Sequence, residues 1–502
     1  MRVNEGEGMW MTLRWQRLLL LGLALILVGA GGSDDPLVDA AKNNDRDALQ
    51  ELLNEGADVN AQTADGSTAL LWASYRDDLE SAEILIRAGA DVNIANDLGA
   101  TPIWAASRNG SAAMANELLG AGADPDAPLL LGETPLVTAS RSGNSEVVRM
   151  LLEKGADINV RGARGQTPLM FAAGQRHPDV VKMLLEYGAD VHAKSDAWNQ
   201  FMAQSPHAHP QHQAWFMHGG NTALMFAVRI GDLESAKHLV AAGGDVDAPS
   251  AWGSTPLAIA TYADFGEQFV IREQTTRQLV YFDRDQILPG QFTELVEFLL
   301  EQGADPNAGA HRFTPLIAAV LRQNEETVGL LLAHGADPNL PLGDFTPHQR
   351  GSTTDFYLHK AWVGATPLWL TARFSTPAIV RRLLEHGADP SFVHHGVYYG
   401  GPPGGNLSQR LEEITSILMA AVKMGTGRAW TVIESDEAMV LETVRLLVDA
   451  GVDVNAIGQA ENGRVADARR ALEAAIALEY DSVVEFLVGK GAITTAEAGL
   501  LR

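Results

Sequence analysis

A repeat of 33 residues runs through this chain and restricts its fold more than any other feature does. The stretches that begin at residues 98, 131 and 164 align with one another without a gap. Three threonines and three glycines recur at this spacing: Thr101, Thr134 and Thr167, and Gly122, Gly155 and Gly188. A unit of this length holds a pair of short helices, which cannot bury its apolar face alone. We therefore expect an array in which each unit stacks on its neighbours.

An anchor residue and a closing glycine mark each unit along the chain. The anchors are Asp35, Thr68, Thr101, Thr134, Thr167, Thr222, Thr255, Thr314, Thr366, Thr415 and Arg470. The glycines are Gly56, Gly89, Gly122, Gly155, Gly188, Gly243, Gly303, Gly335, Gly387, Gly451 and Gly491. Nine of these eleven pairs are 21 residues apart, and the other two carry insertions. The pattern predicts an all-α repeat solenoid of about eleven repeats over residues 31–492, followed by a C-terminal tail at 493–502.

The residues of one unit explain how its two helices begin and end. Thr134 is a typical N-cap, and Pro135 follows at the first helical position, where its missing N–H costs nothing. After a turn at Gly143, the run from Val147 to Leu152 supplies the apolar side of a second helix. Gly155 ends that helix, because glycine adopts the left-handed conformation without strain. The residues that follow are expected to form an extended finger that leads to the next unit.

The unit resembles the ankyrin repeat, which has the same length and a signature that begins Thr-Pro-Leu. The resemblance covers nearly all of residues 35–492 and implies a stack of helix-turn-helix units with β-hairpin or loop fingers. One departure is systematic, because the histidine that follows Thr-Pro-Leu in the family is absent. Other residues stand in its place: Leu71, Trp104, Val137, Met170, Met225, Ala258, Ile317, Trp369 and Leu418. Since the family's histidine hydrogen-bonds adjacent repeats, we expect apolar packing to hold these repeats together instead.

Five insertions interrupt the array. Three of them lengthen the finger between units, at residues 197–218, 343–362 and 397–413. In a stacked array these three should project from the same edge. Two more, at residues 265–290 and 425–438, separate the two helices within a unit and should emerge at the opposite end of the helices.

The three finger insertions are rich in aromatic side chains and histidine. Aromatic side chains that gather on loops are typical of recognition surfaces, and binding specificity in repeat arrays tends to lie in insertions. The candidate partner-binding residues are Trp198, Phe201, Trp215, Phe216, Phe356, Tyr357, Trp362, Tyr398 and Tyr399.

Segment 197–218 contains four histidines and no charged Asp, Glu, Lys or Arg side chain, and three interpretations of it stay open. The segment folds back on the array and covers an apolar patch, or it is a finger that binds a partner, or it binds a metal. The candidate metal ligands are His207, His209, His212 and His218. Zinc is the metal considered, although a zinc site needs ligands at tetrahedral positions and the spacing matches no fixed zinc motif. No other cofactor is indicated.

The formal net charge of −26 argues against a nucleic-acid partner, because phosphates would be repelled over most of the surface. A protein partner with a basic patch fits this charge better. The chain has no cysteine, so it forms neither a disulfide nor a thiolate zinc site. A long secreted chain without disulfides fits a bacterial periplasm or exterior better than a eukaryotic secretory lumen.

The N-terminal segment predicts a secretory signal. Arg14 and Arg17 precede an apolar run from Leu18 to Val28, which small residues follow. This order is typical of a signal peptide, here residues 1–30. The apolar run is shorter than the roughly 20 residues that span a membrane, so we expect no stable membrane span after cleavage. The segment predicts a periplasmic or secreted protein.

No set of nucleophile, base and orienting residue recurs at a fixed spacing, so we expect no enzyme. The resemblance implies a non-catalytic protein-interaction scaffold that binds through its finger loops and the concave helix face. The alternative is a metal- or small-ligand-binding protein, or an enzyme, with a site built by the finger insertions. A third hypothesis is carbohydrate binding through Trp198, Trp215, Tyr398 and Tyr399, because aromatic rings suit the faces of sugars.

Overall fold

The computed structural model divides the chain into two compact units, residues 1–193 and 194–502. The residues that the structure describes are 35–203, 213–263, 271–272, 279–280, 291–309, 313–343, 362–400, 409–424, 436–458 and 470–498. None of the helices in these ranges is both long and apolar enough to cross a membrane. The proposed signal segment 1–30 lies outside the described residues.

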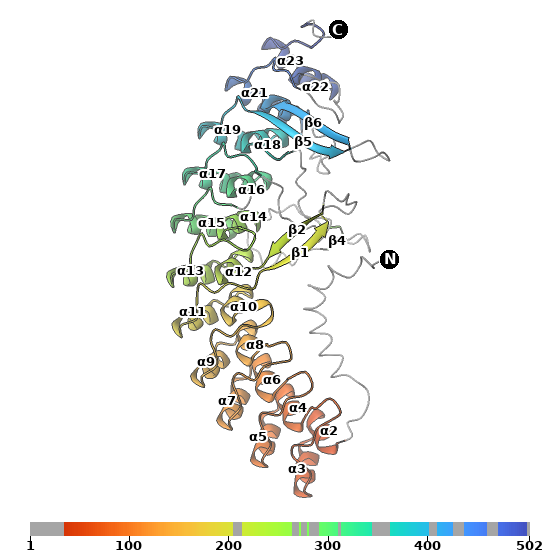
Figure 1. Ribbon diagram of the computed structural model, residues 1–502, viewed down its shortest axis with the longest axis vertical. Helices are drawn as coiled ribbons and strands as arrows, with labels where there is room; N and C mark the ends of the chain where they lie inside the picture. Colours follow the sequence, from red (N-terminus) through yellow and green to blue (C-terminus); the bar gives the residue numbers. More distant parts are fainter. Residues whose placement is uncertain are drawn as a thin grey trace. The chain divides into compact units, whose positions relative to one another are not determined.

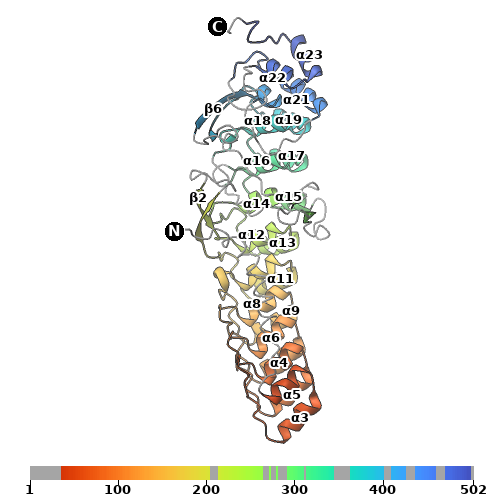
Figure 2. The same ribbon diagram turned by 90° about the vertical axis from the view of Figure 1, so that its right-hand side faces the viewer.

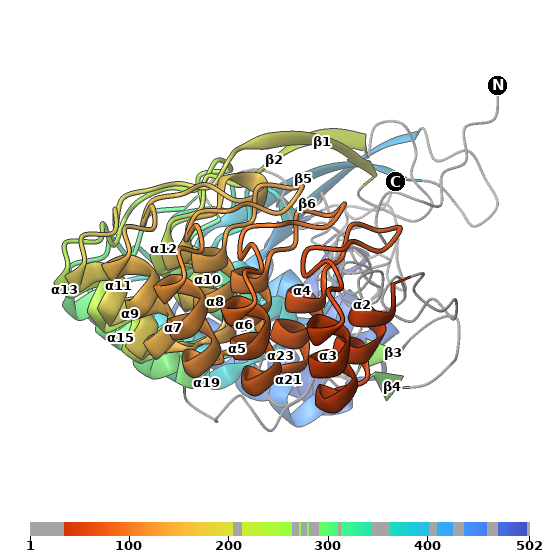
Figure 3. The same ribbon diagram turned by 90° about the horizontal axis from the view of Figure 1, so that it is seen from below.

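Unit 1 is a stack of helix pairs (Figure 1). The pairs are α2 (Pro36–Lys42) with α3 (Arg46–Asn54), α4 (Ala69–Arg76) with α5 (Leu79–Arg87), α6 (Pro102–Asn109) with α7 (Ala112–Gly120), α8 (Pro135–Ser142) with α9 (Ser145–Glu153), and α10 (Pro168–Gly174) with α11 (Pro178–Glu186). The first helix of each pair packs against the first helix of the next, and the second helices do the same. Figure 3 shows these helices on one side of unit 1 and the connecting fingers on the other, as in an ankyrin-like solenoid.

In the ranges that the structure describes, unit 2 consists of the same kind of helix pair and three hairpins. Its helices are α12 (Ala223–Arg229), α13 (Leu233–Ala241), α14 (Pro256–Ala263), α15 (Gln291–Glu301), α16 (Pro315–Leu321), α17 (Glu325–Ala333), α18 (Pro367–Phe374), α19 (Pro377–Glu385), α20 (Ile417–Ala421), α21 (Glu437–Asp449), α22 (Ala471–Ala477) and α23 (Asp481–Gly489).

The anchor threonines cap the first helices as the sequence predicts. The hydroxyl of each accepts a hydrogen bond from the amide three residues later, at 3.2–3.5 Å, in α4, α6, α8, α10, α12, α14, α16 and α18. Asp35 caps α2 in a similar way, through its carboxylate. The prediction is wrong at α20, where Ser416 is the N-cap and accepts from the Met419 amide. Thr415 ends up in a strand, where its hydroxyl accepts from the Trp369 indole N–H at 3.2 Å.

The closing glycines follow the second helices with a positive φ, as expected. Their φ values lie between 85° and 95°, a conformation that strains any other L-residue. A Cβ atom built on Gly155 would meet nothing within 4 Å, and the same holds for the other closing glycines. Glycine is therefore required at these positions by backbone conformation and not by lack of space.

The core of each unit lies between neighbouring helix pairs. First helices are buried almost all round, as in α6, where every residue from Pro102 to Ser107 is buried. Second helices bury one side only, and α9 buries Val147, Val148 and Leu151. The side chains at the position of the missing histidine are all buried, from Ala258 at 6% exposure to Val137 at 0%.

Apolar packing is nevertheless not the only link between repeats, and here the sequence-based expectation is incomplete. Most fingers begin with Gly-Ala-Asp-x-Asx, and the last residue of this motif accepts a hydrogen bond from a backbone amide of the next repeat. In unit 1 these bonds join Asn60 to Asp91, Asn93 to Asp124, Asp126 to Asp157 and Asn159 to Asp190, at 2.8–2.9 Å. In unit 2 they join Asp247 to Asp305, Asn307 to Asp337, Asn339 to Asp389 and Asn455 to Ile493, at 2.8–3.0 Å. We call this series the Asx ladder.

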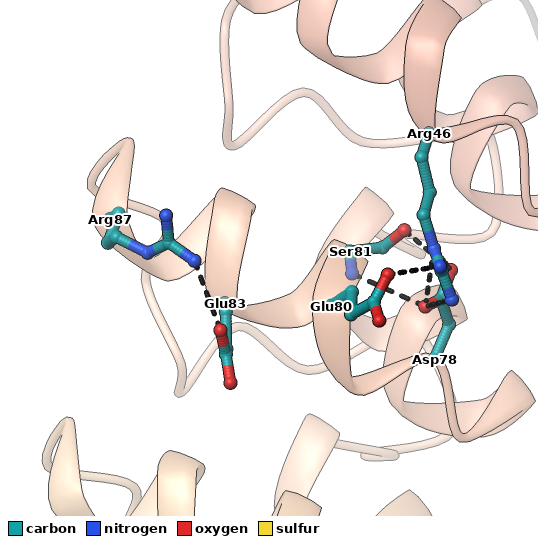
Figure 4. Close-up of polar contacts among 6 residues, drawn as sticks. All are labelled: Arg46, Asp78, Glu80, Ser81, Glu83 and Arg87. Carbon is teal, nitrogen blue, oxygen red and sulfur yellow. Dashed lines mark hydrogen bonds and ion pairs between the residues drawn. The ribbon is translucent and has the colours of Figure 1, made fainter.

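An ion pair adds a further link between the first two helix pairs (Figure 4). The N-cap of α5 is Asp78, which is 4% exposed and accepts from the amide and hydroxyl of Ser81. The guanidinium of Arg46, at the start of α3, donates to both oxygens of Asp78 and also pairs with Glu80. Burial raises the pKa of Asp78, but the bonds from Arg46 and Ser81 outweigh it, so the pKa lies below its usual value.

The insertions of unit 2 form antiparallel hairpins. Strand β1 (Trp198–Ala203) pairs with β2 (Gln213–His218), β3 (Ile271–Arg272) with β4 (Leu279–Val280), and β5 (Val393–Gly400) with β6 (Gln409–Ser416). The β5–β6 hairpin begins before the predicted boundary at 397 and ends after 413. In Figures 1 and 2 the β1–β2 and β5–β6 hairpins project from the same edge of unit 2, whereas Figure 3 places β3 and β4 away from them.

Candidate partner-binding surfaces

The most exposed large apolar side chains described in the structure lie at a finger tip of unit 1. Leu130 is 74% exposed and Leu131 is 61% exposed, between α7 and α8. Their finger is held against the previous one, because the Leu130 amide donates to the Leu98 carbonyl at 2.9 Å. The finger tips therefore stack on one another and present these leucines from a fixed backbone.

Behind this finger lies a small apolar cluster on the first helices. Leu129 packs with Tyr75 against the buried Leu71 and Trp104. The Arg108 guanidinium lies over the Tyr75 ring, 4.9 Å from its centroid, and 5.9 Å from that of Trp104. An apolar surface beside a guanidinium is typical of protein-binding sites, where Tyr, Trp and Arg are enriched.

The first three fingers of unit 1 are acidic. Residues 56–67, 89–100 and 122–133 contain seven carboxylates and no Lys, Arg or His. Burial raises the pKa of Asp65, but hydrogen bonds from Thr63 and Ser67 outweigh it and lower the pKa overall. At Asp126 burial raises the pKa, and the nearby Asp124 and Asp157 raise it further. This edge suits a partner that carries Lys or Arg.

The β5–β6 hairpin has one face against the helices and one outside. Side chains on a strand alternate between faces, so the buried His394 is followed by the exposed His395. Val393 and Val397 are on the outer face, 43% and 44% exposed. The outer face of this hairpin thus presents apolar surface to solvent.

The inner face of the same hairpin is anchored by an aromatic contact. The His394 ring lies 4.6 Å from the Trp369 ring, centroid to centroid, and its Nε2 is 3.1 Å from the Val363 carbonyl oxygen. Burial lowers the pKa of His394 to about 4, so the ring is neutral at pH 7. This histidine is a structural side chain and not an exposed ligand.

A half-buried lysine, Lys423, plays a comparable structural role next to α18. The Nζ of Lys423 donates to the Ser375 hydroxyl at 2.7 Å and to the Arg373 carbonyl. Burial lowers the pKa of Lys423 to about 7, and the charge of Arg373 adds to this effect. The lysine satisfies a backbone carbonyl at the end of α18 and so links two helix pairs of unit 2.

The β1–β2 hairpin holds several of the predicted binding residues. Trp198 and His218 are paired in register and their rings stack, 5.4 Å apart with an interplanar angle of 24°. Met217 is 43% exposed. Phe201 lies opposite Trp215 in the strand register, and Phe216 lies opposite residue 200.

Most of the remaining predicted residues either belong to β5 or lie outside the described residues. Tyr398 and Tyr399 belong to β5, in register with residues 411 and 410. Phe356 and Tyr357, like the histidines His207, His209 and His212, lie outside the described residues. Within the described ranges no group of three or more metal-binding side chains is placed to hold an ion, and zinc at the four histidines stays a prediction.

Trp362 does not belong to an exposed surface, and the expectation that it does is wrong. It is 1% exposed and meets Phe374 edge-on, with 5.7 Å between the ring centroids. Its position at the end of an insertion places it against α18, where it fills the core.

Leu130 and Leu131 were not among the candidates, although a signal for them exists. Residues 129–131 are three consecutive leucines, whereas the equivalent residues of the preceding finger, 96–98, are Asn, Asp and Leu. Neither residue is needed for the core of a finger, so their exposure could have been inferred.

Helix pairs that stack through their first and second helices, joined by fingers along one side, define a repeat solenoid. Ankyrin-repeat family models match residues 37–128 and 104–195 as sets of three copies, and single ankyrin repeats match at 219–251 and 311–341. The chain therefore contains ankyrin repeats at these residues, and such repeats as a class mediate protein–protein interactions and are generally non-catalytic.

A solved structure resembles part of the chain. The human ASB11 ankyrin repeat domain is 29% identical, and the match covers 44% of this chain and 90% of that one, with a TM-score of 0.37. No curated protein matches.

Proposed function

We propose that this chain is a non-catalytic protein-interaction scaffold that acts outside the cytoplasm. It binds its partner through the fingers and the first-helix face of unit 1 and through the hairpins of unit 2. The observation that carries this proposal is where apolar side chains are exposed. Leu130, Leu131, Met217, Val393 and Val397 all lie on fingers or hairpins, where stacking does not need them.

The charge of the chain supports a partner with a basic patch. The exposed leucines lie on the third of the acidic fingers of unit 1, and the whole chain carries a net charge of −26. Complementary charge speeds association and makes it sensitive to salt. Binding is therefore expected to weaken as the ionic strength rises, while the apolar contact at Leu130 and Leu131 keeps part of the affinity.

Action in the periplasm or outside the cell rests on the N-terminal segment. Its basic residues, apolar run and small residues match a signal peptide, and the absence of cysteine fits an extracytoplasmic chain that needs no disulfide. Fractionation of cells that express the chain, together with mass spectrometry of the mature N-terminus, tests this part separately. An intact residue 1 in a cytoplasmic fraction would contradict it.

The binding proposal is tested with the purified full chain as bait. Partners captured from periplasmic extract at low and high salt are identified, and the affinity of each is then measured with the purified partner. The variant Leu130→Ser/Leu131→Ser should weaken binding by about tenfold or more, because it removes two exposed anchors. Tyr187→Ser is the matched control, since Tyr187 is 45% exposed but lies at the end of a second helix. Equal effects of the two variants, or no partner at any salt, would contradict the proposal.

A further inference from the structure

Lys423 holds a place in unit 2 that amide, hydroxyl and imidazole groups hold in other repeats. It follows α20, and its Nζ donates to the Arg373 carbonyl at the end of α18 and to the Ser375 hydroxyl. Backbone carbonyls at the ends of other first helices accept from a side chain of the next repeat in the same way. The donors there are Asn109 to the Ser74 and Tyr75 carbonyls, His177 to the Arg141 carbonyl and Ser142 to the Arg108 carbonyl, at 3.0–3.5 Å. The structural task at this position therefore does not require an amine.

No negative charge compensates an ammonium group at Lys423 in the part of the chain that the structure describes. Helices α18, α21 and α22 and strand β6 pack against α20, and among their charged side chains only Arg373 acts electrostatically on Lys423. The Arg373 guanidinium donates to the Met424 carbonyl at 3.2 Å, so the residue after the lysine fixes this cation beside it. Lys490, by contrast, is paired with Asp449 at 3.4 Å.

Burial and the neighbouring guanidinium both favour the uncharged amine. Lys423 is half-buried, and Val422 and Met424 on either side of it are 0% exposed. Burial is the larger cause and Arg373 the smaller one, and together they lower the pKa of Lys423 to about 7. About half of the Lys423 amines are therefore neutral near pH 7, whereas an unperturbed lysine, with a pKa of about 10.4, is almost wholly protonated there. A desolvated lysine beside another cation is one form of activated nucleophile.

The hydrogen bonds of Lys423 leave the lone pair of its neutral amine available. A neutral amine has two N–H groups and one lone pair, and the bonds to the Arg373 carbonyl and the Ser375 hydroxyl use both N–H groups. The Ser375 oxygen lies 2.7 Å from Nζ, and its hydroxyl proton is free to be donated in turn. The amine is thus held in place by donation alone, and within the described ranges no donor occupies the electron pair that would attack an electrophile.

The charge of Arg373 decides which electrophile suits this amine. Attack on an aldehyde, followed by loss of water, gives a Schiff base that is cationic when protonated, and a neighbouring guanidinium disfavours that product. Attack on carbon dioxide gives a carbamate, which is anionic, and the guanidinium stabilises it. Carbon dioxide is also small and uncharged, so it reaches a half-buried amine without the desolvation cost of an ion.

We propose that Lys423 is a carbon dioxide-binding site, at which Nζ forms a carbamate beside the Arg373 guanidinium. The Nζ lone pair forms a bond to carbon, one carbon–oxygen π bond breaks and its electron pair moves to oxygen, and one N–H proton passes to solvent. Nothing is oxidised or reduced. The remaining N–H donates to the Arg373 carbonyl, and the Ser375 hydroxyl donates to a carbamate oxygen.

The carbamate changes the contact between α18 and α20. It places an anion beside Arg373, where protonated Lys423 places a second cation, so carbon dioxide stabilises unit 2. The site needs no partner protein, and its failure would leave the proposed function above intact.

The test uses the purified full chain near neutral pH with isotopically labelled bicarbonate, which supplies dissolved carbon dioxide. Triethyloxonium converts the carbamate into a stable ethyl ester, and mass spectrometry of the digested chain locates it. The label is expected at Lys423 and not at Lys490, the ion-paired surface lysine of the same molecule. Its occupancy should fall as the pH drops below about 7, the pKa of Lys423, because protonation removes the lone pair. Equal labelling of the two lysines, or no label at Lys423, overturns the proposal without any variant.

Variants test the role of each group. Arg373→Gln should lower the carbamate occupancy about tenfold at a given carbon dioxide concentration, because an opposite charge nearby shifts such an equilibrium by about one pKa unit or more. Arg373→Lys keeps a cation and should restore most of the occupancy. Lys423→Gln keeps a donor for the Arg373 carbonyl, as Asn109 supplies in its own repeat, but has no nucleophile.

The melting temperature separates a carbamate from a merely structural lysine. That of the wild-type chain should rise with carbon dioxide, and that of Lys423→Gln should not. The proposal is overturned if the two chains respond alike, or if Arg373→Gln is labelled as fully as the wild type.

Discussion

Replacing Asp126 by asparagine should stabilise unit 1, because Asp126 is an acid at a position of the Asx ladder where asparagine makes two bonds. In the preceding repeat Asn93 accepts from the Asp124 amide at 2.8 Å and donates from Nδ2 to the Gly122 carbonyl at 3.1 Å. Asp126 accepts from the Asp157 amide at 2.9 Å, but an ionised carboxylate has no proton to donate. The amide of the Asp126→Asn variant would supply the missing donor to the carbonyl of the next closing glycine.

The magnitude follows from two changes. One hydrogen bond adds a net 0.5–1.5 kcal/mol or so. The substitution also removes an acid whose pKa is raised by burial and by the carboxylates of Asp124 and Asp157. We expect a gain of about 1 kcal/mol, which slows amide exchange at Asp157 about fivefold and raises the melting temperature by about 2–4 °C for a unit of this size.

The gain should depend on pH in a defined direction. A carboxyl whose folded pKa is raised stabilises the fold below its unfolded pKa and loses that stabilisation as the pH rises through the folded pKa. The wild-type chain is thus penalised at pH 7 and not at strongly acidic pH, where Asp126 is protonated. The benefit of Asp126→Asn should accordingly be largest near neutrality and shrink on acidification.

The matched control is the reverse change one repeat earlier. Asn93→Asp removes the donor to Gly122 and adds a carboxylate near Asp91 and Asp124, so it should destabilise unit 1 by a similar amount. Urea unfolding and hydrogen exchange measure both variants. If Asp126→Asn proves neutral or destabilising while Asn93→Asp is costly, the missing donor is not what limits the Asp126 position. If both are neutral, the ladder does not contribute to stability.

Two further predictions concern backbone conformation and pH. Gly155→Ala should lower the free energy of unfolding by about 1 kcal/mol, although no atom obstructs the new Cβ. Gly120 lies in a helix and is equally open, so Gly120→Ala should be neutral or stabilising in the same urea assay. Equal effects of the two variants would exclude the positive φ as the cause. The pKa of His394 is about 4 in the folded chain and about 6.5 in the unfolded chain, so the unfolded chain binds more protons between these two pH values. The free energy of unfolding of unit 2 should therefore fall by up to about 3 kcal/mol as the pH decreases through this range. His394→Gln should flatten that part of the melting temperature–pH profile, and an unchanged profile would show that His394 is not responsible.

The sequence allowed the repeat boundaries to be predicted because they depend on local chemistry. An N-cap hydroxyl and a left-handed glycine act within a few residues of their own positions, so Thr134 and Gly155 could be assigned without a neighbour. The one-residue error at Thr415 arose where two capping residues are adjacent. Packing against Trp369 decided between them, because the indole N–H takes the Thr415 hydroxyl and leaves Ser416 to cap α20.

Part of the candidate site could be predicted and part could not. The aromatic residues of the insertions indicated the finger that contains Trp198, which forms a hairpin whose Trp198 ring stacks on His218. Trp362, in contrast, is part of the core, and the exposed Leu130 was not among the predicted residues. The Asx ladder was visible as a recurring Asx residue in the fingers, yet its role depends on an amide about 31 residues away. Composition indicates which side chains are able to bind and does not say which of them remain accessible.

The amino-acid sequence by itself determined the helix pairs, their caps and their order, since each depends on forces that act over one or two turns. Only the tertiary structure decided which of the same residues are surface. Ser74 and Ile476 each lie six residues after the N-cap of a first helix, but Ser74 is 0% exposed and Ile476 is 50% exposed. The physical reason is that burial depends on which side chains of other repeats pack over a residue, so residues with the same local context are buried in one place and exposed in another.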